Sequence, residues 1–401
     1  MKKHRILFTK KRNIILTLLF GFIITGILLA LPTGYEDALI YQGTERATVT
    51  VLSVNNNNII TNGMVQSGEQ RCELQVENGL FAGRTVSGVN FLSGSLAQDK
   101  IFSVGDKALA VISHNEDDIT YATMSDHFRL DKEFILLALF FALLVIFAGK
   151  NGLLSFFSFV ITILSIWKIL IPCYLNGMNP VWIGIGITIF LTLTIIFFVY
   201  GIDRRTLVAS MGSLLGTATT CIMGITFTNL FSIHGAVMES AEGLLYSGYT
   251  SLNLTQIFMS SIFIGASGAM MDLSVDITSA VHEVVQKKPD ISWREAVGSG
   301  MNVGRAAMGT MTTTLLLSYS GGYVCQLMTF MAQGTPVDHI LNYKYVAAEI
   351  LNTIVGSFGL VTVAPITALV AGILLTRKEH ARQVKLSLET KEAGTVSKEV
   401  S

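Results

Sequence analysis

Long apolar stretches with at most one charged side chain constrain this sequence more than any other feature. Such runs lie at residues 14–31, 153–171, 180–200, 206–233 and 345–376. A helix that crosses the hydrocarbon core of a bilayer needs about 20 mostly apolar residues. Charged residues make up only 14% of the 401 residues, whereas a soluble domain carries about 25%. The sequence therefore predicts a multi-pass α-helical membrane protein, and it excludes a disordered chain or a basic nucleic-acid binder.

Eight spanning helices account for the distribution of Lys and Arg. Three further runs complete the set: a short apolar one at 134–148, and two with more polar residues at 255–285 and 305–331. The loops predicted inside carry basic side chains, whereas the outer loops 172–179 and 234–254 carry none, as the positive-inside rule requires. We therefore expect a bacterial plasma-membrane protein in contact with the lipid bilayer, with both termini in the cytoplasm.

This layout divides the chain into four segments. Residues 1–33 form a basic cytoplasmic N-terminus and the first helix, and 34–131 an extracellular domain. Residues 132–376 form a seven-helix transmembrane bundle, and 377–401 a cytoplasmic tail. The first helix is either an uncleaved signal anchor or a cleaved signal peptide. Its apolar run exceeds the usual length of about 7–15 residues, which favours the anchor.

Residues 34–131 are rich in β-strand signals and in acidic side chains. About five short alternating runs are separated by turn signals such as Asn62-Gly63, which predicts a small extracellular all-β barrel of OB-like or SH3-like type. The segment holds 13 acidic and 6 basic side chains, so its net charge is −7 and that of the remaining chain is +7. An acidic domain favours a cation or a basic peptide as its unknown extracellular ligand.

Polar side chains follow one face of the sixth predicted helix. They stand at i, i+4, i+7 and i+11, and they are Asp272, Asp276, Ser279 and Glu283. This spacing places them on one side of a helix. A charged group inside a spanning helix costs roughly 2.5–3.5 kcal/mol, so Asp272 and Asp276 are candidates for proton or cation coupling. Alternatively, the stretch from Asp276 onward is an amphipathic extension in the cytoplasm.

The remaining candidate residues lie on the last three predicted helices. Arg305 stands at the inner edge of the seventh predicted helix. It is either the counter-ion of Asp272 or Asp276, or one more positive-inside anchor. The residues that either line a polar site or serve only helix packing and helix entry are Ser279, Thr310, Thr313, Glu349 and Asn352.

No enzyme motif is present in the sequence. It lacks a nucleophile elbow, HExxH, a Walker A loop and a nucleotide-binding fingerprint. The four cysteines lie far apart without a CxxC pair, so neither a disulfide framework nor a cysteine metal site is predicted. We expect no catalytic activity, no cofactor, no metal and no nucleic-acid partner.

Three local patterns resemble the bacterial YibE/YibF family of multi-pass membrane proteins. They are the segments 63–70, 268–274 and 304–315. The long form with an external domain is similar to the YibE type. The resemblance implies a permease of undefined substrate, with a paralogous YibF-like membrane subunit as a candidate partner. Ala306 and Thr313 stand where the family pattern is expected to have an acid and an amide, which weakens a coupling role for that helix.

A more distant resemblance is to the resistance–nodulation–division transporters and the SecD/SecF translocation proteins. Asp272 in an inward-running helix, Ala296-Val297 in a short basic loop, and Gly304-Arg305 before a Thr-rich helix take the places of their motif. By this analogy Asp272 is a proton-coupling carboxylate.

Two functions are therefore expected. In the first, the bundle is a secondary transporter or export-assisting permease, coupled to protons or cations through the sixth helix. In the second, the protein is a non-transporting envelope assembly or sensor protein, and its external domain recruits an extracellular partner.

Overall fold

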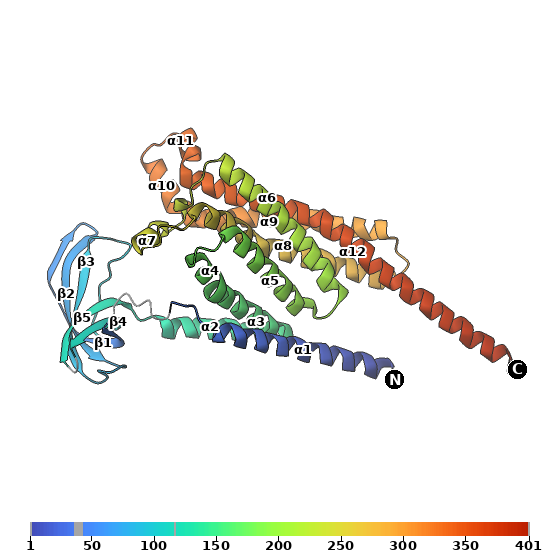
Figure 1. Ribbon diagram of the computed structural model, residues 1–401, viewed down its shortest axis with the longest axis horizontal. Coiled ribbons are helices and arrows are strands. Elements are labelled where there is room, and N and C mark those ends of the chain that lie inside the picture. The colour runs from blue at the N-terminus through green and yellow to red at the C-terminus, as the bar shows by residue number, and fades with distance from the viewer. Residues whose placement is uncertain (1, 36–42, 116–117, 400–401) are drawn as a thin grey trace. The chain divides into compact units, whose positions relative to one another are not determined.

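The computed structural model describes residues 2–35, 43–115 and 118–399, with side chains described between 15 and 377 within these ranges. The chain forms two compact units, residues 35–143 and the remainder (Figure 1). The predicted basic N-terminal segment and the tail after Arg377 lie outside the described side chains. The helical backbone of the tail continues to Glu399.

The smaller unit contains a closed five-stranded barrel. Its strands are β1 (Thr44–Asn62), β2 (Val65–Val76), β3 (Thr85–Ser93), β4 (Lys107–Asn115) and β5 (Asp118–His127). They are hydrogen-bonded in the order β1-β2-β3-β5-β4, and β4 closes the barrel on β1. All neighbouring strands are antiparallel except β3 and β5, which are parallel. This order fits the OB-like alternative of the predicted barrel.

Alternation of apolar and polar residues sets the core-facing side of each strand. In β2 the side chains of Cys72, Leu74 and Val76 are buried, and the residues between them are exposed. Removal of apolar surface from water contributes about 25 cal/mol per Å² to the stability of the fold. A register slip of one residue would turn the whole buried set toward water and lose this contribution. Burial also raises the pKa of the Cys72 thiol to about 11.

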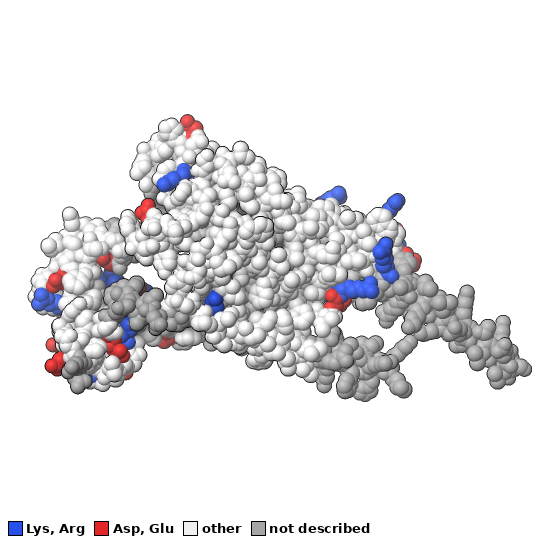
Figure 2. Space-filling view, in the orientation of Figure 1, with Lys and Arg blue, Asp and Glu red and all other residues white. Residues whose placement is uncertain are grey.

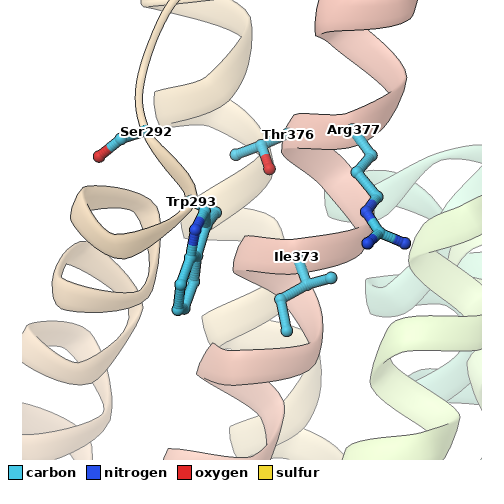
Figure 3. A pocket seen from close by; sticks show the side chains of 5 residues that line it. All are labelled: Ser292, Trp293, Ile373, Thr376 and Arg377. Atoms are coloured by element: carbon cyan, nitrogen blue, oxygen red, sulfur yellow. The ribbon is translucent and has the colours of Figure 1, made fainter.

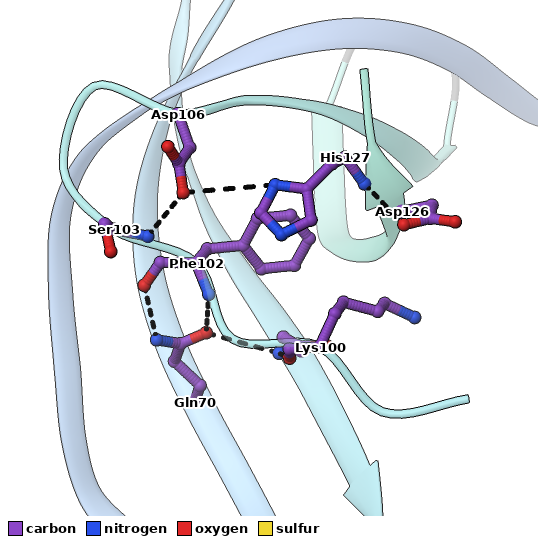
Figure 4. Close-up of polar contacts among 8 residues, drawn as sticks. Gln70, Lys100, Phe102, Ser103, Asp106, Asp126 and His127 are labelled. Carbon is purple, nitrogen blue, oxygen red and sulfur yellow. Dashed lines mark hydrogen bonds and ion pairs between the residues drawn. The ribbon is translucent and has the colours of Figure 1, made fainter. Parts of the chain in front are cut away.

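A buried polar network holds the segment between β3 and β4 against the barrel (Figure 4). Gln70 is fully buried. Its Nε2 donates to the carbonyl oxygen of Phe102 at 2.8 Å, and its Oε1 accepts from the Phe102 amide at 3.0 Å. Asn90 Nδ2 donates to Gln70 Oε1 at 3.2 Å and to the carbonyl oxygen of Lys100 at 2.6 Å. These bonds satisfy backbone groups that the barrel interior would otherwise leave unpaired.

The larger unit is a helical bundle. Its helices are α1 (Lys2–Ala30), α3 (Lys150–Ser165), α4 (Ile171–Leu175), α5 (Pro180–Tyr200), α6 (Arg204–Leu230), α7 (Ala241–Tyr246), α8 (Leu254–Lys287), α9 (Trp293–Ser320), α10 (Val324–Ala332), α11 (Val337–Asn342) and α12 (Lys344–Glu399). The π-helical η1 (Ile166–Leu170) joins α3 to α4, and η2 (Gly235–Val237) and η3 (Gly321–Tyr323) are 3-10 turns. The helix α2 (Leu130–Ala148) runs in sequence from one unit into the other.

Five helices among the described residues are long and apolar enough to cross a membrane. They are Lys150–Leu175, Pro180–Tyr200, Arg204–Leu230, Leu254–Lys287 and Lys344–Arg377, and a shorter apolar helix covers Ile15–Ala30. In the bundle, Lys and Arg gather near the end where α6 begins and α8 ends, and the sides are mostly uncharged (Figure 2). The chain is therefore a membrane-embedded helical protein, whereas eight spans stay a prediction.

Small residues let the helices around α8 approach one another closely. The helix α8 packs against α5, α6, α9 and α12 (Figure 1). A Cβ at Gly216 of α6 would lie 1.9 Å from Val363 Cγ2 of α12, and a Cβ at Gly304 of α9 would lie 2.9 Å from Ala364 Cβ. Inside a bilayer the hydrophobic effect does not drive helices together, so close packing of their backbones stabilises the bundle instead.

The seventh predicted helix, over 305–331, differs from the helix observed. The helix α9 begins at Trp293, because Ser292 and Glu295 form a capping box that satisfies its first amides. Ser292 Oγ accepts from the Glu295 amide at 3.3 Å, and Glu295 Oε2 accepts from the Ser292 amide at 3.1 Å. The helix ends at Ser320, and η3 separates it from α10. The prediction therefore missed twelve residues at its start and the break near Gly321.

Two other predicted boundaries are shifted. The second predicted helix, over 134–148, begins at Leu130 as α2, with Asp131 and Glu133 in its first turn. The helix predicted to end before Pro172 continues to Leu175, because the π-helical η1 precedes the proline, which then stands in the first turn of α4.

Candidate functional site

The acidic face of α8 is exposed on the surface of the bundle. The exposed residues on it are Asp272, Asp276, Ser279 and Glu283. The next residues along the helix, Leu273 and Ile277, are fully buried on its packed side. Glu283 pairs with Lys287 at 2.8 Å. Among the described residues, neither Asp272 nor Asp276 forms an ion pair.

The neighbouring helix α5 shows how far this face extends across the bundle. At the end of α5, the Tyr200 hydroxyl is 2.7 Å from the carbonyl oxygen of Val275 and 2.7 Å from Ser279 Oγ. Near its beginning, Gly184 faces Ser260, since a Cβ at Gly184 would lie 2.1 Å from Ser260 Oγ. The helix α5 therefore runs beside α8 from the level of Ser260 to that of Ser279.

The two acids lie within the depth that α5 covers. With 21 residues, α5 is about 31 Å long at ~1.5 Å per residue, which matches a hydrocarbon core of ~30 Å. On the same rise, Asp272 lies about 10 Å and Asp276 about 5 Å inside the level of Ser279. Both carboxylates are thus placed in the part of the bundle nearest to the end where α8 finishes.

A charged turn closes α5 beside this site. Arg205 Nε is 2.9 Å from Asp203 Oδ2, and the Arg205 guanidinium lies 4.8 Å from the centre of the Tyr200 ring. Burial alone would raise the pKa of the Asp203 carboxyl, but the hydrogen bond and the charge of Arg205 bring that pKa below its usual value. Arg205 is therefore paired with Asp203, at the level where Tyr200 contacts α8.

Arg305 lies level with Asp276 on the neighbouring helix. A Cβ at Gly300 would lie 2.8 Å from Val281 Cγ2, and a Cβ at Gly304 would lie 3.2 Å from Ile277 Cδ1. These contacts place Arg305 opposite the turn of α8 that contains Asp276. Its side chain is exposed, and no ion pair joins it to either acid among the described residues. Its role as a counter-ion stays a prediction.

The threonines of α9 bond to their own helix. Thr310 Oγ1 donates to the carbonyl oxygen of Ala307 at 3.0 Å, and Thr313 Oγ1 donates to that of Gly309 at 3.1 Å. Both threonines are exposed. Their hydroxyl protons are used within the helix, and their oxygen atoms can still accept a hydrogen bond from a neighbour.

Glu349 and Asn352 belong to a second polar cluster at the opposite end of α8. The Glu349 carboxylate lies beside Asn352 and the Tyr323 hydroxyl. Glu349 Oε1 and Asn352 Oδ1 are buried and have no hydrogen-bond partner in the structure. Tyr323 also lines a cavity of about 500 Å³, together with Tyr345 and two exposed acids of the η2–α7 segment. The two ends of the bundle thus have separate sets of carboxylates.

Another cavity, of about 600 Å³, lies between the start of α9 and α12 (Figure 3). It is lined by Ser292, Trp293, Ile373, Thr376 and Arg377. None of the predicted site residues borders it. Within the described residues, no group of three His, Cys, Asp or Glu is placed to hold a metal ion.

Sequence analysis did not single out Tyr200, although the structure places it against the acidic face. An aromatic residue that ends an apolar helix just before Arg204-Arg205 is typical of a membrane interface, and that signal could have identified it. Its contact with Val275 and Ser279 depends on how α5 packs against α8, which no local pattern shows.

Comparison with known proteins places the bundle in one family. The model of the YibE/F-like protein family matches residues 136–377, more than half of the chain. No curated protein and no solved structure matches the chain. The matched region contains the acidic face of α8, Arg305 and the Glu349 cluster, and it excludes the barrel.

Proposed function

We propose, starting from the fact that the chain belongs to the YibE/F-like family, that its bundle is a permease coupled to protons or cations through Asp272 and Asp276. The observation that carries this proposal is the position of two carboxylates one helix turn apart on an exposed face of α8. Both lie inside the depth covered by α5, and neither has a cationic partner among the described residues. The proposal assigns no catalytic step, cofactor or metal to the chain.

The physical basis is the cost of charge at this depth. One ionised carboxylate in the core of a bilayer costs several kcal/mol, and two ionised carboxylates one turn apart also repel each other. A proton or a cation bound between Asp272 and Asp276 lowers both costs. Its binding therefore favours conformations in which the pair is shielded from water, and its release favours those in which the pair is hydrated. Coupling requires such a difference.

Tyr200 and Ser279 supply a hydroxyl path from the acids to the end of the bundle. The two hydroxyl oxygens are 2.7 Å apart, and Ser279 follows Asp276 by three residues on the same face of α8. Hydroxyl groups both donate and accept hydrogen bonds. In the proposed function this pair passes protons between Asp276 and water beside the Asp203–Arg205 turn.

We place the protein in a bacterial plasma membrane with both termini in the cytoplasm and the barrel outside. The support is the concentration of basic residues at one end of the bundle (Figure 2), as the positive-inside rule requires of cytoplasmic loops. The basic residues of this end include Arg204, Arg205, Lys287, Lys288 and Arg294.

One observation favours the second expected function, assembly through the barrel. Met64 and Leu96 are exposed by 83% and 68%, and they line the same small cavity of the barrel. Exposed apolar side chains in an otherwise acidic domain are typical of a contact surface for another protein. In this alternative the barrel recruits an extracellular partner and the bundle serves as its anchor.

The deciding experiment measures ion flux. Full-length protein is reconstituted in vesicles that contain a pH-sensitive dye, and a pH step is applied with and without a membrane potential. We expect wild-type vesicles to dissipate the step faster than empty vesicles, and Asp272→Asn to reduce the excess rate at least tenfold. Glu283→Gln is the matched control, since Glu283 is exposed on the same helix and paired with Lys287.

The outcomes separate the two functions. Loss of flux in Asp272→Asn with normal flux in Glu283→Gln supports the permease. Equal flux in wild type and Asp272→Asn contradicts coupling through this residue. No flux above empty vesicles for protons, Na⁺ or K⁺ contradicts the permease and favours the assembly function. Melting temperatures of all variants in detergent exclude a folding defect.

A further inference from the structure

Half of the residues of α9 are exposed, although the helix lies against α8 and α12. Its contacts with α8 extend from Gly300, which faces Val281, to Tyr319, whose hydroxyl would lie 2.8 Å from a Cβ at Gly265. On the other side it packs along α12, where Gly304 faces Ala364. Only Ala296, Gly300, Gly304 and Leu315 of its 28 residues are buried. Apolar residues such as Met301, Met308 and Met311 pack one side of the helix against the core. The helix therefore covers the same depth as α8, and its other side is uncovered.

The exposed side of α9 between Arg305 and Thr313 is unsuited to lipid. Among the described residues, α9 is not one of the helices apolar enough to cross a membrane. Its exposed residues include Arg305, Ala306, Gly309, Thr310 and Thr313. An arginine facing hydrocarbon is costly, and small residues with hydroxyl groups are typical of helix–helix interfaces. The composition of this face indicates contact with protein.

The acids of α8 and Arg305 complement each other in charge and in depth. Arg305 lies level with Asp276, and Asp272 lies one turn further in. All three side chains are exposed, and none forms an ion pair with another among the described residues. A two-fold axis brings each surface of one copy against the complementary surface of the other. One chain thus carries both halves of an isologous charged contact.

We propose that a second copy of this chain docks on the exposed face of α9, and that Arg305 of each copy pairs with the partner's Asp276. Two such pairs form per dimer, because an isologous contact repeats itself. Ala306 and Gly309 allow the backbones to approach closely. The dimer would supply the acidic pair with its counter-ion, and this consequence for coupling rests on the proposed function. The dimer itself is testable without any flux measurement.

Disulfide cross-linking in membranes tests the contact face. Gly309→Cys is introduced on α9 and Gly186→Cys on α5, since both glycines are exposed and a Cβ at either meets nothing within 4 Å. Cys325 is exposed and is replaced by Ser in both variants. With oxidant, we expect a covalent dimer for Gly309→Cys and at least tenfold less for Gly186→Cys. Equal cross-linking at both positions, or none at Gly309→Cys, would overturn the proposed face.

Charge exchange between two tagged copies tests the pairing. Arg305→Glu alone and Asp276→Lys alone each place like charges across the two-fold axis, so we expect the dimer fraction in nanodiscs to fall at least fivefold. When the two variants are produced together, a mixed dimer restores opposite charges at both contacts, because the two substituted side chains meet each other and the two native side chains meet each other. We then expect mixed dimers at the wild-type level and few dimers of either variant alone.

The mixing experiment separates pairing between chains from pairing within one chain. If Arg305 pairs with Asp276 of its own chain, the variant Asp276→Lys/Arg305→Glu recovers but the mixture of single variants does not, and the proposal is overturned. A monomeric wild type in nanodiscs, or dimers only with a different membrane subunit, also overturns it. The flux result for Asp272→Asn is independent, so a failed dimer leaves the permease proposal standing, and a failed permease leaves the dimer standing.

Discussion

The hydroxyl of Tyr200 and the hydroxyl of Ser279 lie 2.7 Å apart and join the end of α5 to α8. The same Tyr200 hydroxyl is 2.7 Å from the carbonyl oxygen of Val275. At the other end of α5, the Tyr174 hydroxyl, which follows η1, contacts Ser260 and the carbonyl oxygen of Pro180. Two tyrosines thus hold α5 against α8 at both ends, but only Tyr200 lies beside the acids.

Replacement of these tyrosines separates stability from transport. Tyr200→Phe and Tyr174→Phe each remove hydrogen bonds worth about 0.5–1.5 kcal/mol apiece, so we expect similar decreases in the melting temperature in detergent. Only Tyr200→Phe should slow proton flux, by about tenfold, because it interrupts the hydroxyl path from Asp276. A slowing of equal size in both variants would assign the effect to packing of α5.

The close contact of α6 with α12 predicts a strong effect of one methyl group. In Gly216→Ala the new Cβ would lie 1.9 Å from Val363 Cγ2, and Val363 is fully buried. We expect a loss of about 1–3 kcal/mol in unfolding free energy, seen as a melting temperature several degrees lower.

Gly186→Ala is the control for this change. A Cβ at Gly186 meets nothing within 4 Å, and alanine favours a helix by about 1 kcal/mol over glycine. Its melting temperature should stay the same or rise. A decrease as large as that of Gly216→Ala would show that the contact with Val363 is not the cause.

The network around Gln70 predicts a destabilised barrel when the amide is lost. Gln70→Met leaves the amide and the carbonyl of Phe102 buried without partners, at a cost of about 1–3 kcal/mol. We expect faster hydrogen exchange in residues 94–106 of the full-length protein. Gln75→Met on the exposed side of β2 is the control. Unchanged exchange in Gln70→Met would contradict the role assigned to the network.

Asp99 predicts a pH dependence in the same part of the barrel. The backbone hydrogen bond from Ser93, followed by those from Gly94 and Ser95, holds the pKa of the Asp99 carboxyl below its usual value of 3.8. A carboxyl with a lowered folded-state pKa stabilises the fold fully above the unfolded value, and this contribution is lost as the pH falls through the folded value.

Hydrogen exchange at the Gly94 and Ser95 amides measures this effect. In wild type we expect protection to fall below about pH 4. Asp99→Asn should show low protection at every pH and little dependence on pH. Asp118→Asn, at an exposed acid of β5, should keep the wild-type profile. A wild-type profile in Asp99→Asn would contradict the assignment.

The sequence predicted the apolar helices and the barrel because both depend on local patterns. The helix over 180–200 matches α5, since an uninterrupted apolar run and Asn179 as N-cap determine its extent. The start of α9 was predicted twelve residues late, although Ser292-x-x-Glu295 is a readable capping signal. Hydropathy hid that helix, because much of its exposed face is small and polar.

Only the part of the site that lies on a single helix could be predicted from the sequence. The spacing of Asp272 and Asp276 predicts a common face, and both are exposed in the structure. Which helix lies beside that face depends on contacts such as Tyr200 with Val275, between residues 75 positions apart. The helical spacing of residues along the sequence does not show such contacts. It also could not show that Arg305 has no ion-pair partner within the described part of its own chain.

The parallel pairing of β3 with β5 has a mechanical consequence for the barrel. These strands are paired only at Gly88 with Ala122 and Val89 with Thr123, whereas every other neighbouring pair of strands shares a longer ladder. The barrel therefore has one weak seam. A pulling force, or a ligand that wedges between strands, would open it there into a curved sheet with two free edges, and the remaining ladders would stay intact.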